Sequence, residues 1–123
     1  MFSVGIDMIE IDRIEKSMKN PRFCRRVLGV REYKQLELRG FPAQSVAASF
    51  CAKEAFAKCV GSGIRDFWFN DVELMREENG RPYLVLSNKA LEIATKRGYK
   101  FSVSVTHTRE LVSVVVMAMR VQK

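Results

Sequence analysis

The sequence predicts an α+β domain with a mainly antiparallel sheet packed on a long helix. Two observations support this fold class. Apolar residues alternate with polar ones, or run without a break, at the start of the chain and in two later pairs of segments, as they do in strands. Between these segments the apolar spacing is helical, so the order is strand, helices, hairpin, helix and hairpin.

The first strand is predicted by a period of two. Its apolar positions are Phe2, Val4, Ile6 and Met8. Because alternate side chains of a strand point to opposite faces, we expect this apolar set to face the core. Asp7 then lies on the other face, two residues from Gly5, which leaves space beside it.

Helices are predicted from Ile11 onward, where the apolar spacing changes. The first ends before Pro21, because proline cannot continue a helix, and a short basic helix and a second one ending at Gly40 follow. Pro42 suits the first turn of the long helix, and Gly61 suits its C-terminal cap. This long helix is apolar almost all round, which is typical of a core helix.

The second half is predicted to be mainly β structure. The segments "WFNDVELM" and "PYLVL" are strands joined at Asn79-Gly80, the strongest hairpin signal in the chain. A helix that ends at Gly98 follows, and two more strands meet at a turn formed by Thr108-Arg109.

The bulk composition favours one compact domain, residues 1–123, because 47% of the residues are hydrophobic and 28% are charged. No apolar run approaches the roughly 20 residues that span a bilayer, and acidic residues interrupt the first apolar stretch, unlike a secretory signal. The three cysteines form no C-x-x-C pair, and we interpret them as reduced side chains. We therefore expect a cytoplasmic protein with no membrane partner.

The formal net charge of +7 predicts an acidic partner. Between Asp12 and Arg39, nine lysines and arginines stand against four acidic residues, so this basic segment alone has a charge of +5. Nucleic acid, an anionic membrane, and an acidic protein with a phosphorylated ligand all fit this charge. A solvated basic face, which needs no partner, fits it as well.

Two carboxylates are embedded in apolar sequence, Asp7 in the first strand and Glu54 in the long helix. A carboxylate held against a core needs a partner. Two acids from separate elements are enough to hold magnesium, whose other ligands are waters and substrate phosphates. A second explanation stays open, in which Asp7 lies at a strand edge and Glu54 pairs with Lys58 one turn later.

Further groups near the long helix suit a phosphate. Lys53 and Lys58 add cations, and the "GSGI" turn that follows the helix adds backbone N–H groups. The turn consists of Gly61, Ser62, Gly63 and Ile64. It is no P-loop, since its glycines follow a helix, and ordinary helix capping explains them equally well. His107, the only histidine, either donates to an anion or is structural.

Together these motifs resemble one known family. The segments "VGIDMIEIDRI", "RFCRRVL", "FCAKEAFAKCVGSGI", "DVELMREENGRPYL" and "VSVTHT" are similar, in sequence and spacing across nearly the whole chain, to the holo-(acyl carrier protein) synthases, which are 4'-phosphopantetheinyl transferases. The resemblance implies the fold of that family and a transfer of 4'-phosphopantetheine from coenzyme A to a serine of apo acyl carrier protein. The products are holo acyl carrier protein, for fatty acid biosynthesis, and adenosine 3',5'-bisphosphate.

The resemblance also implies a role for each matching residue. Asp7 and Glu54 are the magnesium ligands and, with Lys58, the catalytic residues. The residues implied for the coenzyme A site are Lys53, Lys58, Gly61, Ser62, Gly63, Ile64, Arg81, Pro82, His107 and Thr108. The base that removes the serine proton stays open between a metal-bound water and a neighbouring carboxylate.

Members of the family form homotrimers with active sites between subunits. The resemblance therefore implies that one subunit supplies Asp7 and Glu54 while the next supplies residues around Arg81, Pro82 and His107. Acyl carrier proteins are acidic, which implies a docking role for part of the basic segment. The docking residues are Arg13, Arg22, Arg25 and Arg26.

A small basic RNA-binding domain and a structural oligomerisation domain are the alternatives. Against the first, no RNA-binding motif is present and the aromatic residues lie in apolar stretches, so no nucleic acid partner is expected. The second leaves Asp7 and Glu54 unexplained. One position departs from the family pattern: members often have arginine just before the F-x-A-K-E-A segment, where this chain has Ser49. Losing that cation would weaken coenzyme A binding unless another basic side chain replaces it.

Overall fold

The chain is described by a computed structural model over residues 1–61 and 66–121. Its elements are β1 (Phe2–Glu10), α1 (Ile11–Met18), α2 (Phe23–Val27), α3 (Val30–Glu37), α4 (Ala43–Val60), η2 (Phe69–Asp71), β2 (Val72–Arg76), β3 (Pro82–Leu86), α5 (Asn88–Arg97), β4 (Tyr99–His107) and β5 (Leu111–Arg120). Strand β5 pairs with β1 and β4 in a three-stranded sheet, β2 pairs with β3 in a second sheet, and these pairs are antiparallel. The predicted α+β class is confirmed.

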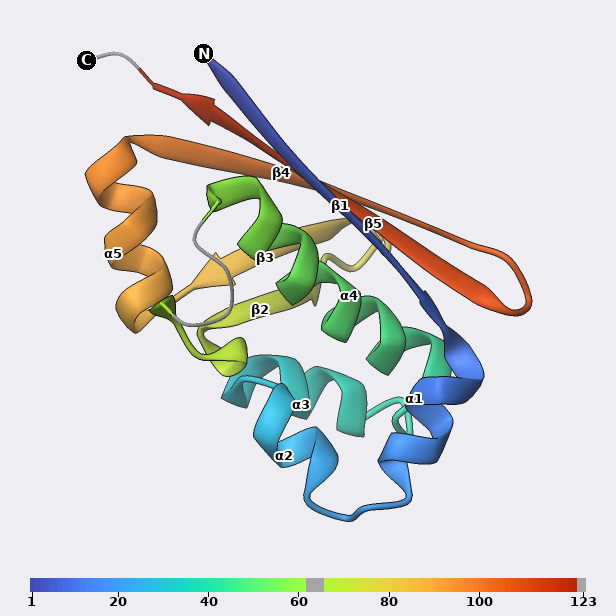
Figure 1. Cartoon of the computed structure of the whole chain (residues 1–123). Helices are drawn as coiled ribbons and strands as arrows, with labels where there is room; N and C mark the ends of the chain where they lie inside the picture. The colour runs from blue at the N-terminus through green and yellow to red at the C-terminus, as the bar shows by residue number, and fades with distance from the viewer. Residues whose placement is uncertain (62–65, 122–123) are drawn as a thin grey trace.

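Helix α4 is the central element of the fold. In Figure 1 it lies between the three-stranded sheet and the helices α1 to α3. Most of its side chains are buried, as its apolar sequence predicts. The helix ends at Gly61, whose φ of 72° is the left-handed conformation that glycine adopts at C-terminal caps. Residues on the different faces of α4 therefore meet different neighbouring segments.

The buried face of β1 is the reverse of the prediction. Gly5 and Ile9 are buried on the face toward α4, whereas the apolar set Phe2, Val4, Ile6 and Met8 is 60–69% exposed. A Cβ atom at Gly5 would collide with backbone atoms of Ala55 and Cys59, so the strand and the helix approach each other across this glycine. The period of two predicted the strand correctly, but it does not determine which face meets the core.

An outer apolar face results on the three-stranded sheet. It consists of Phe2, Val4, Ile6 and Met8 of β1 with Val115, Met117 and Met119 of β5. These residues lie opposite one another in the register, for example Val4 with Met117. Met117 and Met119 are 45% and 47% exposed, so this face is open in the single chain. Among the described residues, none of the helices combines the length and the apolar character that a membrane crossing needs.

Candidate active site

Strand β1 and helix α4 bring the two predicted metal ligands together. Asp7 lies on the face of β1 that packs against α4, and Glu54 is half-buried on α4. Burial raises the pKa of Glu54, the nearby charge of Asp7 raises it further, and Lys58 opposes the change. Asp7 is therefore close enough to Glu54 for its charge to disfavour the ionised form of Glu54.

Lys58 does not form the predicted alternative pair with Glu54. Its ammonium Nζ lies 3.1 Å from Asp7 Oδ1 and also donates to the carbonyl oxygen of Ile6 at 3.1 Å. Within the described residues, the ion pairs do not include Glu54. One lysine thus faces two carboxylates, and an oxygen-binding divalent cation would relieve the remaining negative charge.

The carboxylate oxygens of Asp7 and Glu54 are suitable ligands for magnesium. Two carboxylates and no softer ligand are typical of a magnesium site that is completed by waters and phosphates. In residues 1–61 and 66–121 no group of three or more His, Cys, Asp or Glu gathers as a complete protein cage. Cys51 lies beside Asp7, with 3.5 Å between Sγ and Oδ2, but burial and then the Asp7 charge raise the pKa of its thiol to about 12. Cys51 therefore stays protonated and adds no thiolate ligand.

Lys53 requires a correction. It is fully buried, and its ammonium lies 2.7 Å from Glu32 Oε1 and also donates to the carbonyl oxygen of Val72. Burial lowers the pKa of Lys53, and the charge of Glu32 opposes this change. A side chain that is enclosed between α3, α4 and β2 does not reach a bound substrate. Lys53 is a structural cation, and its assignment to the coenzyme A site is wrong for this structure.

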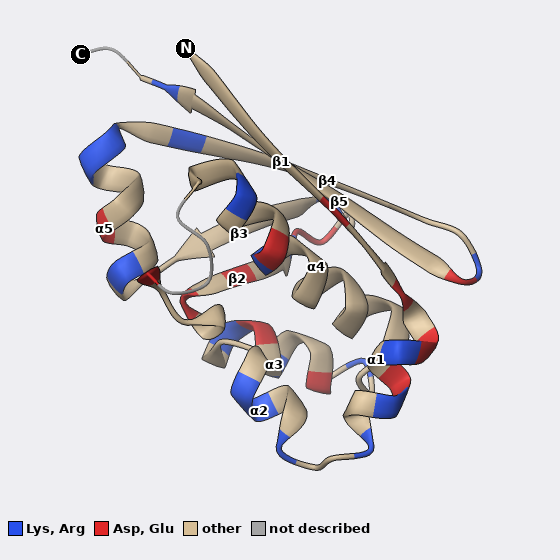
Figure 2. Ribbon diagram, in the orientation of Figure 1, with Lys and Arg blue, Asp and Glu red and all other residues tan. Residues whose placement is uncertain are grey.

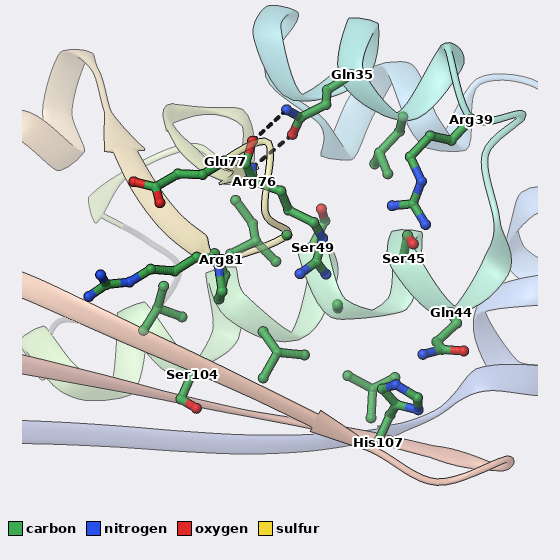
Figure 3. A pocket seen from close by; sticks show the side chains of 18 of the residues that line it. Gln35, Arg39, Gln44, Ser45, Ser49, Arg76, Glu77, Arg81, Ser104 and His107 are labelled. Atoms are coloured by element: carbon green, nitrogen blue, oxygen red, sulfur yellow. Dashed lines mark hydrogen bonds between the residues drawn. The ribbon is translucent and has the colours of Figure 1, made fainter.

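A cavity of about 730 Å³ lies between α3, α4, the β2–β3 hairpin and β4 (Figure 3). This volume is typical of small-molecule sites. The cavity is lined by three of the predicted residues, Arg81, Pro82 and His107. Thr108 is not among the lining residues. Its hydroxyl accepts two backbone N–H groups within the β4–β5 turn at 3.1 and 3.2 Å. Of the predicted loop, Gly61 caps α4, and Ser62, Gly63 and Ile64 lie outside the described residues.

The cavity and the carboxylate pair lie on opposite faces of α4. Ser45 and Ser49 line the cavity. Glu54 follows Ser45 by nine residues, and Lys58 follows Ser49 by nine residues. Nine residues are about 2.5 helical turns, so the two sets point in opposite directions. The single chain therefore separates the predicted metal ligands from Arg81, Pro82 and His107, although the family resemblance implies that they act in one reaction.

The sequence and the fold both match known proteins. Residues 3–113 match the family model of the 4'-phosphopantetheinyl transferase superfamily. The chain belongs to this superfamily. A holo-[acyl-carrier-protein] synthase of Alkaliphilus metalliredigens is 42% identical over 110 residues, which are 87% of this chain and 89% of that protein. One of Clostridium kluyveri is 41% identical and covers 87% and 81% of the two chains.

Solved structures of the superfamily have the same fold. The holo-[acyl-carrier-protein] synthase of Neisseria meningitidis has a TM-score of 0.88 at 28% identity, with 96% of this chain and 98% of that chain covered. The enzyme of Helicobacter pylori, solved in complex with coenzyme A, has a TM-score of 0.82 at 28% identity, with 94% and 99% covered. The family recognised from the sequence motifs is therefore confirmed.

Two cavity residues of this phosphopantetheinyl transferase were not selected from the sequence. Arg39 and Arg76 both line the cavity, next to Ser49. Arg39 lies just after α3 and counted only as part of the basic segment, and Arg76 ends β2. Only the chain packing brings them together, since 37 positions separate them in the sequence.

The predicted docking arginines lie on one side of this transferase. Arg13 on α1, Arg22 before α2, and Arg25 and Arg26 on α2 are all exposed. Figure 2 shows lysines and arginines along α1, α2 and the segment that joins them. The guanidinium of Arg25 lies 4.8 Å from the centre of the Tyr33 ring, a cation–π contact that orients this side chain. The four predicted docking arginines are therefore accessible at the protein surface, as a docking role requires.

Proposed function

We propose that this chain transfers 4'-phosphopantetheine from coenzyme A to a serine hydroxyl of apo acyl carrier protein, in a magnesium-dependent reaction. The observation that supports this most directly is the pairing of Asp7 with Glu54 in a member of the phosphopantetheinyl transferase superfamily. The RNA-binding alternative has no comparable support. We take residues 1–123 as one catalytic domain.

Asp7 and Glu54 would hold magnesium, and Lys58 would stand beside them. The ion would neutralise negative charge on the pyrophosphate of coenzyme A. Its P–O–P bond breaks when the serine oxygen attacks the pantetheine-linked phosphorus, and adenosine 3',5'-bisphosphate is the leaving group. Lys58 is anchored by the Ile6 carbonyl and by Asp7, so its ammonium is directed at the same place, where it can bind a phosphate oxygen. The pKa of Glu54 is raised in the folded protein, so its ionised form is disfavoured. A cation bound beside the carboxylate would stabilise that ionised form.

We propose a homotrimer in which each active site lies between two subunits. The outer apolar face supports this, because such a surface is costly in water and is typical of a subunit interface. The opposite placement of the carboxylate pair and the cavity supports it as well. A neighbouring subunit could present its cavity, with Arg81, Pro82 and His107, to the carboxylates that α4 turns away from its own cavity.

Subunit mixing tests the composite site. Glu54→Ala and His107→Ala should each be inactive alone, and a mixture should regain activity after subunits exchange, because some sites then combine two intact halves. Light scattering that reports a stable monomer would contradict the proposal. So would mixtures that stay inactive although labelled subunits are seen to exchange.

We propose that Arg13, Arg22, Arg25 and Arg26 bind the acidic surface of the carrier protein. Exposed cations at a rim act mainly on encounter rates and are screened by salt, with a Debye length of about 10 Å at 0.1 M. Replacing Arg22, Arg25 and Arg26 by Glu should raise the KM for the carrier about tenfold or more and leave the KM for coenzyme A unchanged. A rise in the coenzyme A KM alone would assign this segment to the other substrate.

The decisive experiment is an incubation with apo acyl carrier protein, coenzyme A and magnesium, followed by intact mass measurement. The carrier should gain the mass of phosphopantetheine, and the gain should disappear when magnesium is removed by a chelator. No gain under any metal condition would reject the function. A cytoplasmic location is proposed as well, and it is supported by three free thiols, Cys24, Cys51 and Cys59, which a reducing compartment would preserve.

A further inference from the structure

The only tryptophan of the chain is exposed to solvent. Trp68 lies immediately before η2, and 74% of its surface is accessible. Tryptophan is highly buried on average in folded proteins, because its ring has a large apolar area. At this exposure the ring adds little to the core, so the packing of the fold does not explain a tryptophan at this position.

The backbone of Trp68 is fixed although its side chain is exposed. Its N–H donates to Asp71 Oδ2 at 3.3 Å, and its carbonyl oxygen accepts the Asp71 N–H at 2.9 Å. Asp71 is buried, and its Oδ1 accepts the side-chain amide of Asn88 at 3.0 Å. The next residue, Phe69, packs edge to face on Phe50 of α4, with 5.3 Å between ring centres. A side chain that is presented from a fixed backbone loses little freedom on binding, which favours a contact with a partner.

A second cavity, which we call the η2 cavity, lies next to this tryptophan. It has a volume of about 650 Å³ and is enclosed by α2, α3, η2 and the start of α5. Asn70 and Asp71, which follow Trp68 within three positions, line it, and so does Val30 at the start of α3. Val30 is 75% exposed. Two exposed apolar side chains, Val30 and Trp68, therefore belong to the surroundings of one cavity.

The η2 cavity continues the predicted docking surface. Arg25 of α2, one of the proposed docking arginines, lines this cavity. On the α3 side, Arg31 and Lys34 line it as well, and Figure 2 shows these basic positions on α2 and at the start of α3. A partner that is bound to the arginines of α2 would therefore reach the η2 cavity without leaving the basic surface.

The carboxylates of the η2 cavity leave two of its cations unpaired. Glu73 is buried and pairs with Arg31, with 3.0 Å between Oε1 and the guanidinium. Glu37 is exposed at the end of α3. Among the residues that the structure describes, the ion pairs include neither Arg25 nor Lys34. These two cations are therefore available to an acidic partner.

We propose that Trp68 and Val30 are apolar anchors for the carrier protein, and that its binding surface extends from α2 across the η2 cavity to Trp68. This proposal rests on the proposed function. An acidic segment of the carrier would meet Arg25 and Lys34, and an apolar side chain of that segment would pack on the Trp68 ring. Tryptophan and arginine are the residues that most often dominate the binding energy of an interface. The apolar anchors would supply affinity, whereas the surrounding cations mainly accelerate the encounter.

Steady-state kinetics with the carrier test the two anchors. Trp68→Ala should raise the KM for the carrier about tenfold or more, and Val30→Ala about threefold, because apolar contacts with the carrier are lost. The KM for coenzyme A and kcat at saturating carrier should stay unchanged. Trp68→Phe should keep part of the affinity, since it retains an aromatic ring. Thermal unfolding checks that each variant is folded.

Leu91→Ala is the matched control. Leu91 is an apolar residue of α5 that is 49% exposed, and it is not among the described residues that line the η2 cavity. Its removal should change neither KM. A rise in the carrier KM as large as that of Trp68→Ala would overturn the assignment to the η2 cavity.

Trp68 also reports binding directly, because the chain has no other tryptophan. Titration with an apo carrier protein that lacks tryptophan, without coenzyme A or magnesium, should move the fluorescence emission to shorter wavelength as the ring leaves water. Lys34→Glu should move this titration to higher carrier concentration, because it places a like charge opposite the acidic segment. An emission that stays constant while the carrier binds would overturn the proposal. So would the same shift when the protein is concentrated alone, since a second copy would then cover Trp68.

The outcomes separate this proposal from the proposed function. If Trp68→Ala transfers phosphopantetheine with an unchanged carrier KM, the anchor is rejected and the proposed function stands. If the unaltered protein transfers nothing to the carrier, the proposed function fails. The fluorescence titration still decides in that case whether the carrier contacts Trp68.

Discussion

Lys53 and Glu54 are neighbours in the sequence, yet their charged groups lie in contrasting surroundings. Lys53 is fully buried against Glu32, and the carboxylate of Glu32 also accepts backbone N–H groups from Gly29 and Leu74 at 3.0 and 2.9 Å. Glu54 is only half-buried, and the group beside it is another carboxylate, Asp7. The first cluster is complete within the chain, and the second has an excess of negative charge.

The contrast shows how a structural charge differs from a candidate ligand site. Around Lys53, each acceptor and donor has a partner inside the protein, which allows full burial. Around Glu54, the like charge of Asp7 raises the cost of ionisation, and only an external cation would remove that cost. The adjacent lysine and glutamate in the sequence do not by themselves distinguish these two situations.

The largest effect is expected from removing the carboxylates. Asp7→Ala and Glu54→Ala should each abolish the proposed magnesium-dependent transfer and leave the fold intact, because they remove the proposed metal ligands and no large apolar contact. Glu54→Gln is the sharper variant, since it keeps the shape and removes the charge. Steady-state assays at saturating magnesium measure this, with circular dichroism as the control for folding. Full activity in Glu54→Gln would reject the metal assignment.

Lys53→Met should instead destabilise the fold. It leaves Glu32 as an uncompensated buried charge, so the free energy of unfolding should fall by about 3 to 5 kcal/mol in urea titrations. The double variant Lys53→Met with Glu32→Gln removes both charges and should recover much of this loss. If Lys53→Met kept full stability and lost coenzyme A binding, Lys53 would be a substrate ligand and our correction would be wrong.

The affinity of the Glu54 site for magnesium should depend on pH. Because the pKa of Glu54 is raised in the folded protein, a proton competes with magnesium as the pH falls through that pKa. The affinity for magnesium should then fall by up to about tenfold per pH unit below it. Calorimetry at several pH values measures this, and Glu54→Gln should bind weakly at every pH. An affinity that is independent of pH would contradict the role of Glu54.

The smallest effect concerns the stability of the metal-free protein. A raised folded-state pKa means that ionised Glu54 opposes folding, so its stability contribution is lost as the pH rises from the ordinary glutamate pKa through the raised one. Glu54→Gln should therefore unfold at the same temperature as the unaltered protein or slightly higher, within about 0.5 kcal/mol near neutral pH. A clear loss of stability would show that Glu54 has a favourable partner in the fold, as Lys53 does.

The sequence by itself determined the family and most of the secondary structure, although the strand predicted from Trp68 begins only at Val72, after the short helix η2. The glycine at position 61, the Asn79-Gly80 turn and the apolar periods act over a few neighbouring residues, so their consequences can be predicted from the chain alone. The motifs around Asp7, Glu54 and His107 were likewise sufficient to recognise a phosphopantetheinyl transferase. The unusual position of the Glu54 carboxylate in an apolar helix was also recognised from the sequence alone.

Only the tertiary structure decided which face of β1 meets α4 and which member of the Lys53-Glu54 pair is buried. A strand of period two can present either face, and the close approach at Gly5 selected the face with Asp7. Lys53 meets Glu32 across 21 positions of sequence, and Arg39 meets Arg76 across 37. The physical reason is the same in each case: local patterns fix backbone conformation, whereas the partner of a charged side chain depends on which distant segments pack beside it.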